Sequence, residues 1–284
     1  MTSDIDKLVK LLEVKQIDKY LFSGRSPKRP SRVFGGQVLA QALNAATRTV
    51  DDTRITHSLH AYFLRPGNPG KQIIYEVDPI RDGKSFTTRN VIAKQDGIAI
   101  FSSSISFHIE EPGLSHQFDM MQVTPPEQLE SDFERWTRLA DENPGEIDPP
   151  ISHPIERKAV QPRDYLNPQP QDPQQQIWFR ALGELGDDLS RHQTVLAFMS
   201  DFGLLGSALL PHPHTGMDKA LQSASLDHAL WFHQPFRADE YLLYCLDSPV
   251  SGGGRGFSRG SFYTREGVLV ASTAQESLLR LRKD

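Results

Sequence analysis

An internal repeat limits the folds open to this chain more than any other feature of its sequence. The stretches GKSFTTRNVIAKQDGIAIFSSSISF and GRGFSRGSFYTREGVLVASTAQESL each predict two strands joined at a glycine-containing turn. Three landmarks recur at a nearly constant offset along the chain: Phe63 with Phe232, Phe86 with Phe257, and Gly97 with Gly267. The chain is therefore predicted to contain two copies of one unit of about 110 residues.

Each copy also has a predicted helix ahead of its strands. In the first copy, GGQVLAQALNAATRTV opens after a glycine pair and carries a stripe of small apolar residues. In the second, DDLSRHQTVLAFMSDF places Leu196 and Met199 on one face, with Asp187 or Asp188 as the N-cap. This order predicts an α+β fold in which each unit wraps an antiparallel sheet around its helix. If the two sheets join edge to edge, their edge strands are protected.

The middle of the chain has a different composition. More than half of the 20 prolines fall between Glu111 and Pro173, and proline lacks a backbone donor, so a regular sheet is not expected there. One helix is expected at about residues 126–141, where apolar residues recur at helical spacing. We therefore expect an N-terminal unit at 1–110, a proline-rich connecting segment at 111–175 and a C-terminal unit at 176–284. Residues 203–224 have no counterpart in the first unit and are interpreted as an insertion.

Charge and cysteine content exclude several classes of function. The 284 residues carry a net charge of −5, so neither nucleic acid nor an anionic membrane surface is expected as a partner. Cys245 is the only cysteine, so no internal disulfide or cysteine zinc site is expected. The opening residues, MTSDIDKLVKLLEV, are unlike a secretory signal, and no apolar run approaches the roughly 20 residues that span a bilayer. A cytoplasmic protein without stable membrane insertion is the expectation.

Several long motifs, in order along the chain, resemble those of a known family. RVFGGQVLAQAL, LHAYFLRPG, QQIWFRALG, MSDFGLLGSALLPH, SASLDHALWFHQPF and GVLVASTAQE together look like the acyl-CoA thioesterase II family, over residues 8–281. The resemblance implies a double-hotdog fold, which agrees with the repeat. It also implies hydrolysis of acyl-CoA to CoA and fatty acid, no metal or organic cofactor, and a homo-oligomer, either a dimer or a tetramer.

The same resemblance implies a catalytic triad of Asp, Thr or Ser, and Gln, which the motifs place at Asp201, Ser225 and Gln275. Thioester hydrolysis needs an activated water and donors for the developing oxyanion. An ionised Asp attracts a water proton, and the Ser and Gln side chains can each donate to and accept from that water. The repeat adds separate support, because the eighth residue after the hairpin glycine is Gln275 in the second unit and Ile105 in the first.

Other patterns suggest alternatives. Residues 256–260 match the G-x-S-x-G motif of serine hydrolases, but a strand rather than a helix is expected after Ser258. His214 and Asp218 match an acyltransferase pattern, whereas Asp148 and His153 match the spacing of hotdog-fold hydratases within the proline-rich segment. A non-catalytic acyl-CoA or lipid-binding module and a hotdog-fold enoyl-CoA hydratase remain the alternatives to a hydrolase.

Two further groups of polar residues have ambiguous roles. His228 and His233 are five residues apart, which puts them on opposite faces of a strand and favours packing over a shared metal. Four arginines near predicted strand ends or loops are candidates for the CoA phosphates or for solvated surface positions. They are Arg65, Arg89, Arg255 and Arg259.

Overall fold

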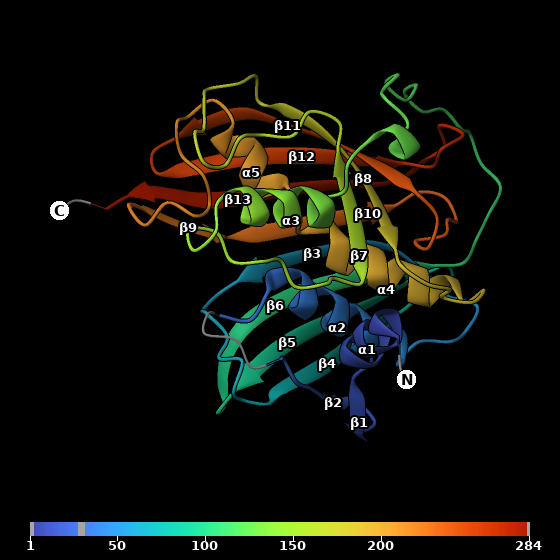
Figure 1. Ribbon diagram of the computed structural model, residues 1–284. Helices are drawn as coiled ribbons and strands as arrows, with labels where there is room; N and C mark the ends of the chain where they lie inside the picture. Colours follow the sequence, from blue (N-terminus) through green and yellow to red (C-terminus); the bar gives the residue numbers. More distant parts are fainter. Residues whose placement is uncertain (1–2, 28–31, 283–284) are drawn as a thin grey trace.

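The computed structural model describes residues 3–27 and 32–282, and the strands in these ranges form one antiparallel sheet (Figure 1). The strands are β1 (Lys15–Asp18), β2 (Leu21–Gly24), β3 (Ile55–Phe63), β4 (Ile73–Asp82), β5 (Phe86–Gln95), β6 (Ile98–His108), β7 (Ile155–Ala159), β8 (Gln174–Ala181), β9 (Leu221–Ser225), β10 (Asp227–Phe232), β11 (Leu242–Gly252), β12 (Arg255–Tyr263) and β13 (Leu269–Leu281). The helices are α1 (Asp4–Leu12), α2 (Gly35–Thr47), α3 (Asp132–Glu142), α4 (Leu189–Ser200) and α5 (Leu204–Leu209), with a 3₁₀ turn at Pro126–Gln128.

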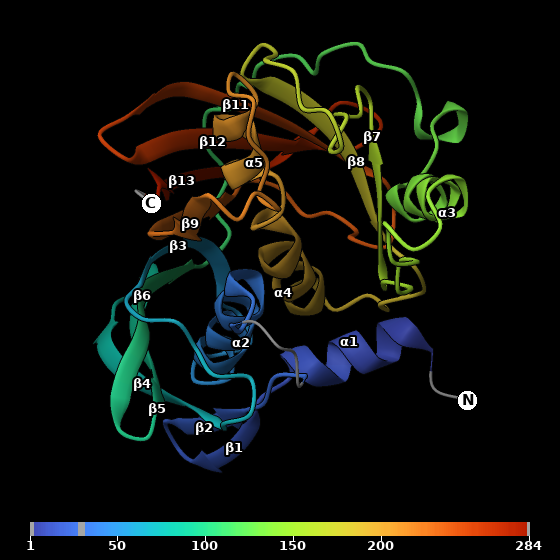
Figure 2. The ribbon, with the colours of Figure 1, turned by 60° about the vertical axis from the view of Figure 1, so that its left-hand side comes forward.

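The sheet consists of two halves of matching order that meet at β3 and β10. From this seam the strands run β6, β5, β4 and β2 in one direction and β13, β12, β11 and β8 in the other. Each half curves around one helix, α2 in the N-terminal half and α4 in the C-terminal half, and these two helices pack side by side (Figure 2). This arrangement is the double hotdog that the repeat and the resemblance predicted.

Glycines at the start of α2 permit the close contact between the two helices. A Cβ added to Gly36 would lie 2.4 Å from the carbonyl oxygen of Phe198, and one added to Gly35 would lie 2.7 Å from Oδ2 of Asp201. Both distances are far below van der Waals contact, so a side chain at Gly36 would clash with backbone and one at Gly35 would displace the Asp201 carboxylate. The N-terminus of α2 consequently lies directly against the C-terminal end of α4, which places residues of both halves around one point.

Turn chemistry fixes the hairpins of both halves. Asp96 and Gly97 have φ values of 49° and 78° between β5 and β6, and Gly253 and Gly254 have φ values of 59° and 75° between β11 and β12. Two consecutive positive φ values are typical of the type I′ turn, whose twist matches that of the flanking strands. The hairpin predicted at Gly267 is also present, with φ of 87°. The predicted hairpins are therefore confirmed.

One of the three repeat landmarks is wrong by two residues. In the sheet register Thr88 pairs with Ser106, and Phe257 pairs with Glu276. Ser106 and Glu276 are equivalent at the offset that relates Gly97 to Gly267, so the counterpart of Phe257 is Thr88 rather than Phe86. The two phenylalanines match in sequence because each stands three residues after a glycine, Gly83 or Gly254, and the strand register shows that this shared pattern does not mark equivalent positions.

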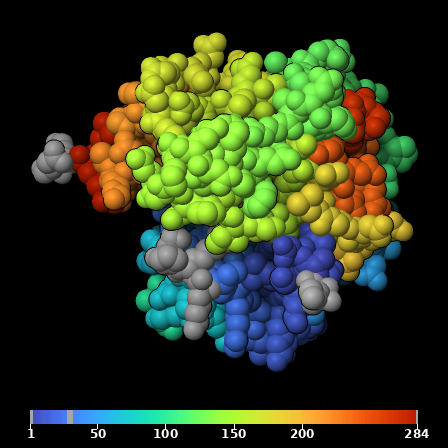
Figure 3. Space-filling model, in the orientation of Figure 1, coloured from blue at the N-terminus to red at the C-terminus, as the bar shows by residue number. Residues whose placement is uncertain are grey.

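The proline-rich segment contains one strand that the sequence did not predict. β7 follows Pro154 and pairs with β8 at the end of the sheet, where a preceding proline is tolerated because one side of the strand is unpaired. The expected helix is present as α3, which begins after a capping box at Ser131 and Glu134. The proline-rich segment, coloured green and lime in Figure 3, lies over the front of the C-terminal half. Trp178 anchors it there by donating from Nε1 to the carbonyl oxygen of Thr124 at 3.0 Å.

The main hydrophobic core lies between the concave face of the sheet and the helices. Its C-terminal part includes Tyr244, whose ring stacks on Phe262 at 3.7 Å between centroids. Gly260 lies beneath this ring, where a Cβ would come within 2.2 Å of it. No helix in the described ranges is long and apolar enough to cross a lipid bilayer.

Candidate active site

A pocket of about 990 Å³ lies where the two halves meet. Its walls come from α1, the first turn of α2, the loop after β3, residues 152–154, the end of α4 and the end of β9. Asp201 and Ser225 both line it, whereas Gln275 does not. The structure therefore brings two of the three predicted residues to the pocket wall and leaves the third behind it.

Asp201 is the C-cap of α4, and its carboxylate lies against the N-terminus of α2. Oδ2 accepts the backbone N–H of Gly36 at 2.8 Å, and Oδ1 accepts the Ser225 hydroxyl at 3.4 Å. Burial raises the pKa of Asp201 to about 7, while the hydrogen bonds from Gly36 and Ser225 and the positive charge of Arg32 oppose that rise. The side chain can therefore change its protonation state near neutral pH.

Ser225 owes its position to a one-residue irregularity in the sheet. It ends β9 opposite Ser277 of β13, but β10 resumes on the same partner with the register shifted by one residue. Leu226 fills the extra position, and Oδ1 of Asp227 accepts the backbone N–H of Glu276 at 2.6 Å. This local arrangement turns the Ser225 hydroxyl toward Asp201.

Gln275 is buried on the inner face of β13, with 1% of its surface exposed. Its Oε1 lies 2.9 Å from Nδ1 of His228, and its Nε2 donates to Oγ of Ser277 at 3.1 Å. Ser277 lies directly opposite Ser225. Gln275 is thus hydrogen-bonded to the residue that pairs with Ser225 across the two strands.

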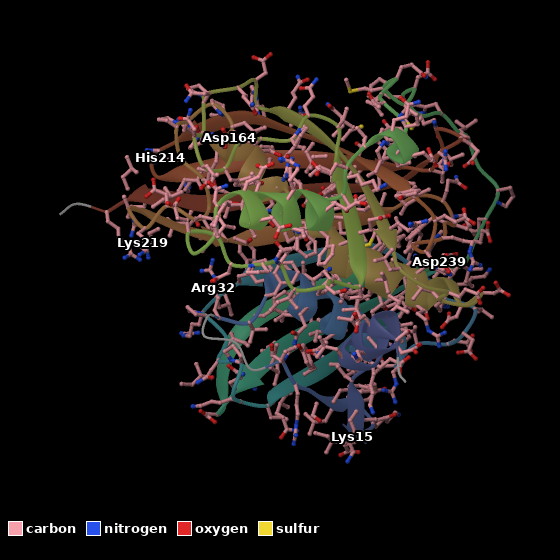
Figure 4. The ribbon with its side chains drawn as sticks, in the orientation of Figure 1. Lys15, Arg32, Asp164, His214, Lys219 and Asp239 are labelled. Carbon is pink, nitrogen blue, oxygen red and sulfur yellow. The ribbon has the colours of Figure 1, made fainter. Side chains whose placement is uncertain are left out.

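Apolar and basic side chains both line this pocket. Its aromatic lining residues are Phe34, Phe63, Phe101, Phe198 and Phe202, and its basic ones are Lys7, Arg32, Arg65 and Arg157. Figure 4 shows Arg32 at the border between the two halves, and its Nη2 donates to the carbonyl oxygen of Ser223 at 2.9 Å. The pocket can therefore accommodate a ligand with both an apolar and an anionic part.

His153 is a pocket residue whose location the sequence did not indicate. The sequence placed it in the proline-rich segment as half of a hydratase spacing, but the fold brings it to the pocket wall without Asp148. Its ring stacks on Phe198 at 6.1 Å and meets Phe202 edge-on at 5.8 Å. Only the tertiary fold brings this ring into the same pocket as Asp201.

The remaining candidate sites lie away from the pocket. Ser258 is buried within β12 and donates to the carbonyl oxygen of Leu204 at 2.8 Å, so the serine-hydrolase motif is coincidental. His214 and Asp218 are 2.6 Å apart but line no part of this pocket, and Figure 4 shows His214 at the outer end of the C-terminal half. Within the described ranges, no group of three or more His, Cys, Asp or Glu could hold a metal ion.

The four candidate arginines lie in different environments. Arg65 lines the pocket. Arg89 is buried, contrary to the expectation of a strand-end or loop position, and its guanidinium binds Asp82 and the backbone at the end of α2. Arg255 and Arg259 form surface ion pairs with Glu276 and Asp247. Only Arg65 among the four can reach a ligand in this pocket.

Comparison with known proteins assigns the chain to a family. Residues 24–108 match the family model described as the acyl-CoA thioesterase N-terminal domain, and residues 150–278 match the model described as acyl-CoA thioesterase. Acyl-coenzyme A thioesterase 8 of Mus musculus is 40% identical over 96% of this chain and 88% of its own length. Acyl-CoA thioesterase 2 of Haemophilus influenzae is 35% identical over 99% of both chains.

A solved structure gives the same result. The crystal structure of an acyl-CoA thioesterase II from Mycobacterium marinum superposes with a TM-score of 0.79 and 41% identity, over 96% of this chain and 98% of that one. Sequence similarity and fold similarity thus extend over nearly the whole chain. This chain belongs to the acyl-CoA thioesterase II family and is an acyl-CoA thioesterase that hydrolyses acyl-CoA thioesters.

Proposed function

We propose that Asp201, Ser225 and Gln275 together activate and orient the water that attacks the thioester. The observation that carries this proposal is the hydrogen bond from Ser225 to Asp201 at the wall of a pocket made by both halves. Family membership establishes the reaction, and the roles of these three residues are inferred from their chemistry and position.

Asp201 is the proposed proton acceptor. Its pKa of about 7 is close to the value at which a general base is most effective near neutral pH. The backbone N–H of Gly36 holds one carboxylate oxygen in place. A fixed carboxylate orients the water that it deprotonates, which removes much of the entropic barrier to attack.

Ser225 and Gln275 are the proposed orienting groups. The Ser225 hydroxyl is already fixed on Asp201. The amide nitrogen of Gln275 has two hydrogens, and its partner Ser277 stands opposite Ser225 across the strand pair. The thiolate of CoA is a good leaving group, so the proposal requires no strong general acid.

The lining of the pocket suggests how the substrate is oriented. Five phenylalanine rings provide apolar surface for the acyl chain, which is favoured because binding there removes the chain from water. The basic residues of the pocket, among them Arg65 and Arg157, match the phosphates of CoA. The homo-oligomeric state and the cytoplasmic location expected from the sequence remain predictions.

The variant Asp201→Asn tests the proposal. Because Asn cannot accept the water proton as a carboxylate does, CoA release in a thiol-trapping assay should fall by about 100- to 10,000-fold, the usual contribution of a general base. Asp218→Asn is the matched control, since Asp218 is also hydrogen-bonded but lies outside the pocket. Near-normal turnover by Asp201→Asn with an intact fold would remove Asp201 from the mechanism.

A further inference from the structure

We propose that His228 is a positioning residue, which fixes the direction in which the side-chain amide of Gln275 faces. The proposal rests on the role proposed above for Gln275. The sequence pattern favoured packing for this histidine, because His228 and His233 are five residues apart and fall on opposite faces of a strand. The structure instead shows its ring bonded to two polar side chains next to the site.

The two residues face each other across adjacent strands. Ala229 of β10 pairs with Ala274 of β13, so His228 lies opposite Gln275. Each is only 1% exposed, and Nδ1 of His228 lies 2.9 Å from Oε1 of Gln275. The other ring nitrogen, Nε2, lies 2.9 Å from Oγ of Ser200, the residue before Asp201. The histidine therefore connects the strand of Gln275 to the helix that ends at Asp201.

Hydrogen-bond chemistry defines the tautomer. The carbonyl oxygen of a glutamine only accepts, so Nδ1 of His228 carries the proton. In the neutral ring Nε2 is then the acceptor, and the single proton of the Ser200 hydroxyl is shared between this nitrogen at 2.9 Å and the carbonyl oxygen of Ala197 at 3.0 Å. With its oxygen held by His228, Gln275 presents its amide N–H groups toward Ser277 and the Ser225 side of the sheet. Loss of the ring would allow the amide to turn over and present its oxygen there instead.

The first half of the molecule shows that the fold does not need this polar pair. Leu59 lies four residues before Phe63, as His228 lies four before Phe232, and Leu59 pairs with Ile105 at the position of Gln275. Both Leu59 and Ile105 are fully buried. The same backbone position accepts two aliphatic side chains, so a polar pair in the second half points to the reaction rather than to folding.

The first experiment compares His228→Leu with His228→Asn. Leu removes the donor, and kcat should fall by roughly 10- to 100-fold because the orienting group is misplaced, with KM nearly unchanged since His228 does not line the pocket. Asn can place an N–H near the position of the lost Nδ1–H and should restore most of kcat. Equal losses from Leu and Asn, or a loss confined to KM, would overturn the proposal.

A double-mutant cycle separates positioning from a general structural effect. If His228 acts through Gln275, then adding His228→Leu to Gln275→Ala should change kcat by less than about twofold, whereas independent effects would multiply. Should Gln275→Ala alone keep normal turnover, the role proposed for Gln275 fails, and the role of His228 fails with it. If Gln275→Ala lowers kcat and the effects of the two substitutions multiply, then only the His228 proposal is overturned, and the role proposed for Gln275 stands.

Two further variants test whether the loss of kcat comes from misfolding or from a displacement of Asp201. His228→Leu with Gln275→Ile recreates the Leu59–Ile105 pair, and the double variant should fold and have a kcat about as low as that of Gln275→Ile alone. Ser200→Ala removes the other hydrogen bond of the ring and should keep most of kcat. If Ser200→Ala lowers kcat as much as His228→Leu does, the ring acts through the end of α4, and the assignment to Gln275 is wrong.

Discussion

At equivalent positions the two halves of the molecule bury opposite kinds of side chain. Leu59 and Ile105 form an apolar pair in the first half, and His228 and Gln275 form a hydrogen-bonded pair in the second. A buried polar group is costly unless it is bonded, and the second half satisfies this condition through Ser200 and Ser277. The comparison shows that one half retains a packed core where the other places a polar network beside the pocket.

Both halves have a hydroxyl side chain at one further equivalent position, but the residues around it differ. Thr56 is the counterpart of Ser225 at the offset that relates Phe63 to Phe232, but it stands opposite Phe107 rather than a serine. The C-cap of α2 is Arg48, whereas that of α4 is Asp201. The first half therefore keeps a hydroxyl but has an arginine at the helix position where the second half has its carboxylate, so a hydroxyl alone does not define the site.

The largest expected effect is on stability and comes from the apolar half. Leu59→Ala should lower the free energy of unfolding by about 2–5 kcal/mol, the range for removing a buried leucine. Denaturant unfolding measures this loss, and kcat per folded molecule should stay near that of the unaltered enzyme. A large loss of kcat in well-folded Leu59→Ala would contradict the division of roles between the halves.

Gln275→Ile gives the second half the residue found in the first. The variant should lose about 100-fold in kcat, as expected for a misoriented nucleophile. It should also lose about 1–3 kcal/mol of stability, because the Nδ1–H of His228 is left without an acceptor. Ile105→Val is the matched control in the other half, and its kcat should not change. Wild-type kcat in Gln275→Ile would show that the polar pair is not part of the reaction.

Ser225→Ala and Thr56→Ala compare the two hydroxyl positions directly. Ser225→Ala should lower kcat by about tenfold, which corresponds to one hydrogen bond to a charged group. Thr56→Ala should leave kcat unchanged, since Thr56 does not line the pocket. Ser225→Thr keeps the donor and should retain most activity. Equal kcat losses in both alanine variants would mean that the hydroxyls act through folding, and steady-state assays of folded protein distinguish these outcomes.

The smallest effect expected is a thermal shift from Asp201→Asn. The pKa of Asp201 is raised from 3.8 to about 7 in the folded protein, so folding binds a proton between these values and stability falls as pH rises through this window. Asn carries no such penalty. The melting temperature of Asp201→Asn should therefore exceed that of the unaltered enzyme at pH 8, and the difference should shrink toward pH 4. A lower melting temperature at pH 8 would contradict the burial of an ionised carboxylate.

Local sequence patterns predicted much of the fold because they report local chemistry. Glycine turns and alternating residues fixed the hairpins, and the repeat predicted two similar units. The strand β7 was missed because proline content reports average composition, whereas an edge strand needs only a few residues with one free side. The landmark at Phe86 failed because a glycine followed by a phenylalanine three residues later is a short pattern, and it falls at different register positions in the two copies.

The candidate site was predictable only in part. The motifs predicted Asp201, Ser225 and Gln275 as site residues. The repeat separately indicated Gln275, because the equivalent residue of the first copy is the aliphatic Ile105. No pattern indicated that Gln275 lies behind the pocket wall, that His228 holds its amide, or that His153 joins the pocket. Those features depend on the curvature of the sheet and on contacts between segments far apart in the chain, such as that of His228 with Gln275, which sequence periodicity does not encode.

The pH dependence of kcat tests most directly the claim that the carboxylate of the second half is the base. With the pKa of Asp201 near 7, kcat should fall about tenfold per pH unit below pH 7 and level off above it, because only the ionised carboxylate accepts the water proton. His153 also lines the pocket, so His153→Gln serves as the control and should keep the same inflection. An inflection lost in His153→Gln, or a kcat that is flat from about pH 5 to 8, would contradict the account.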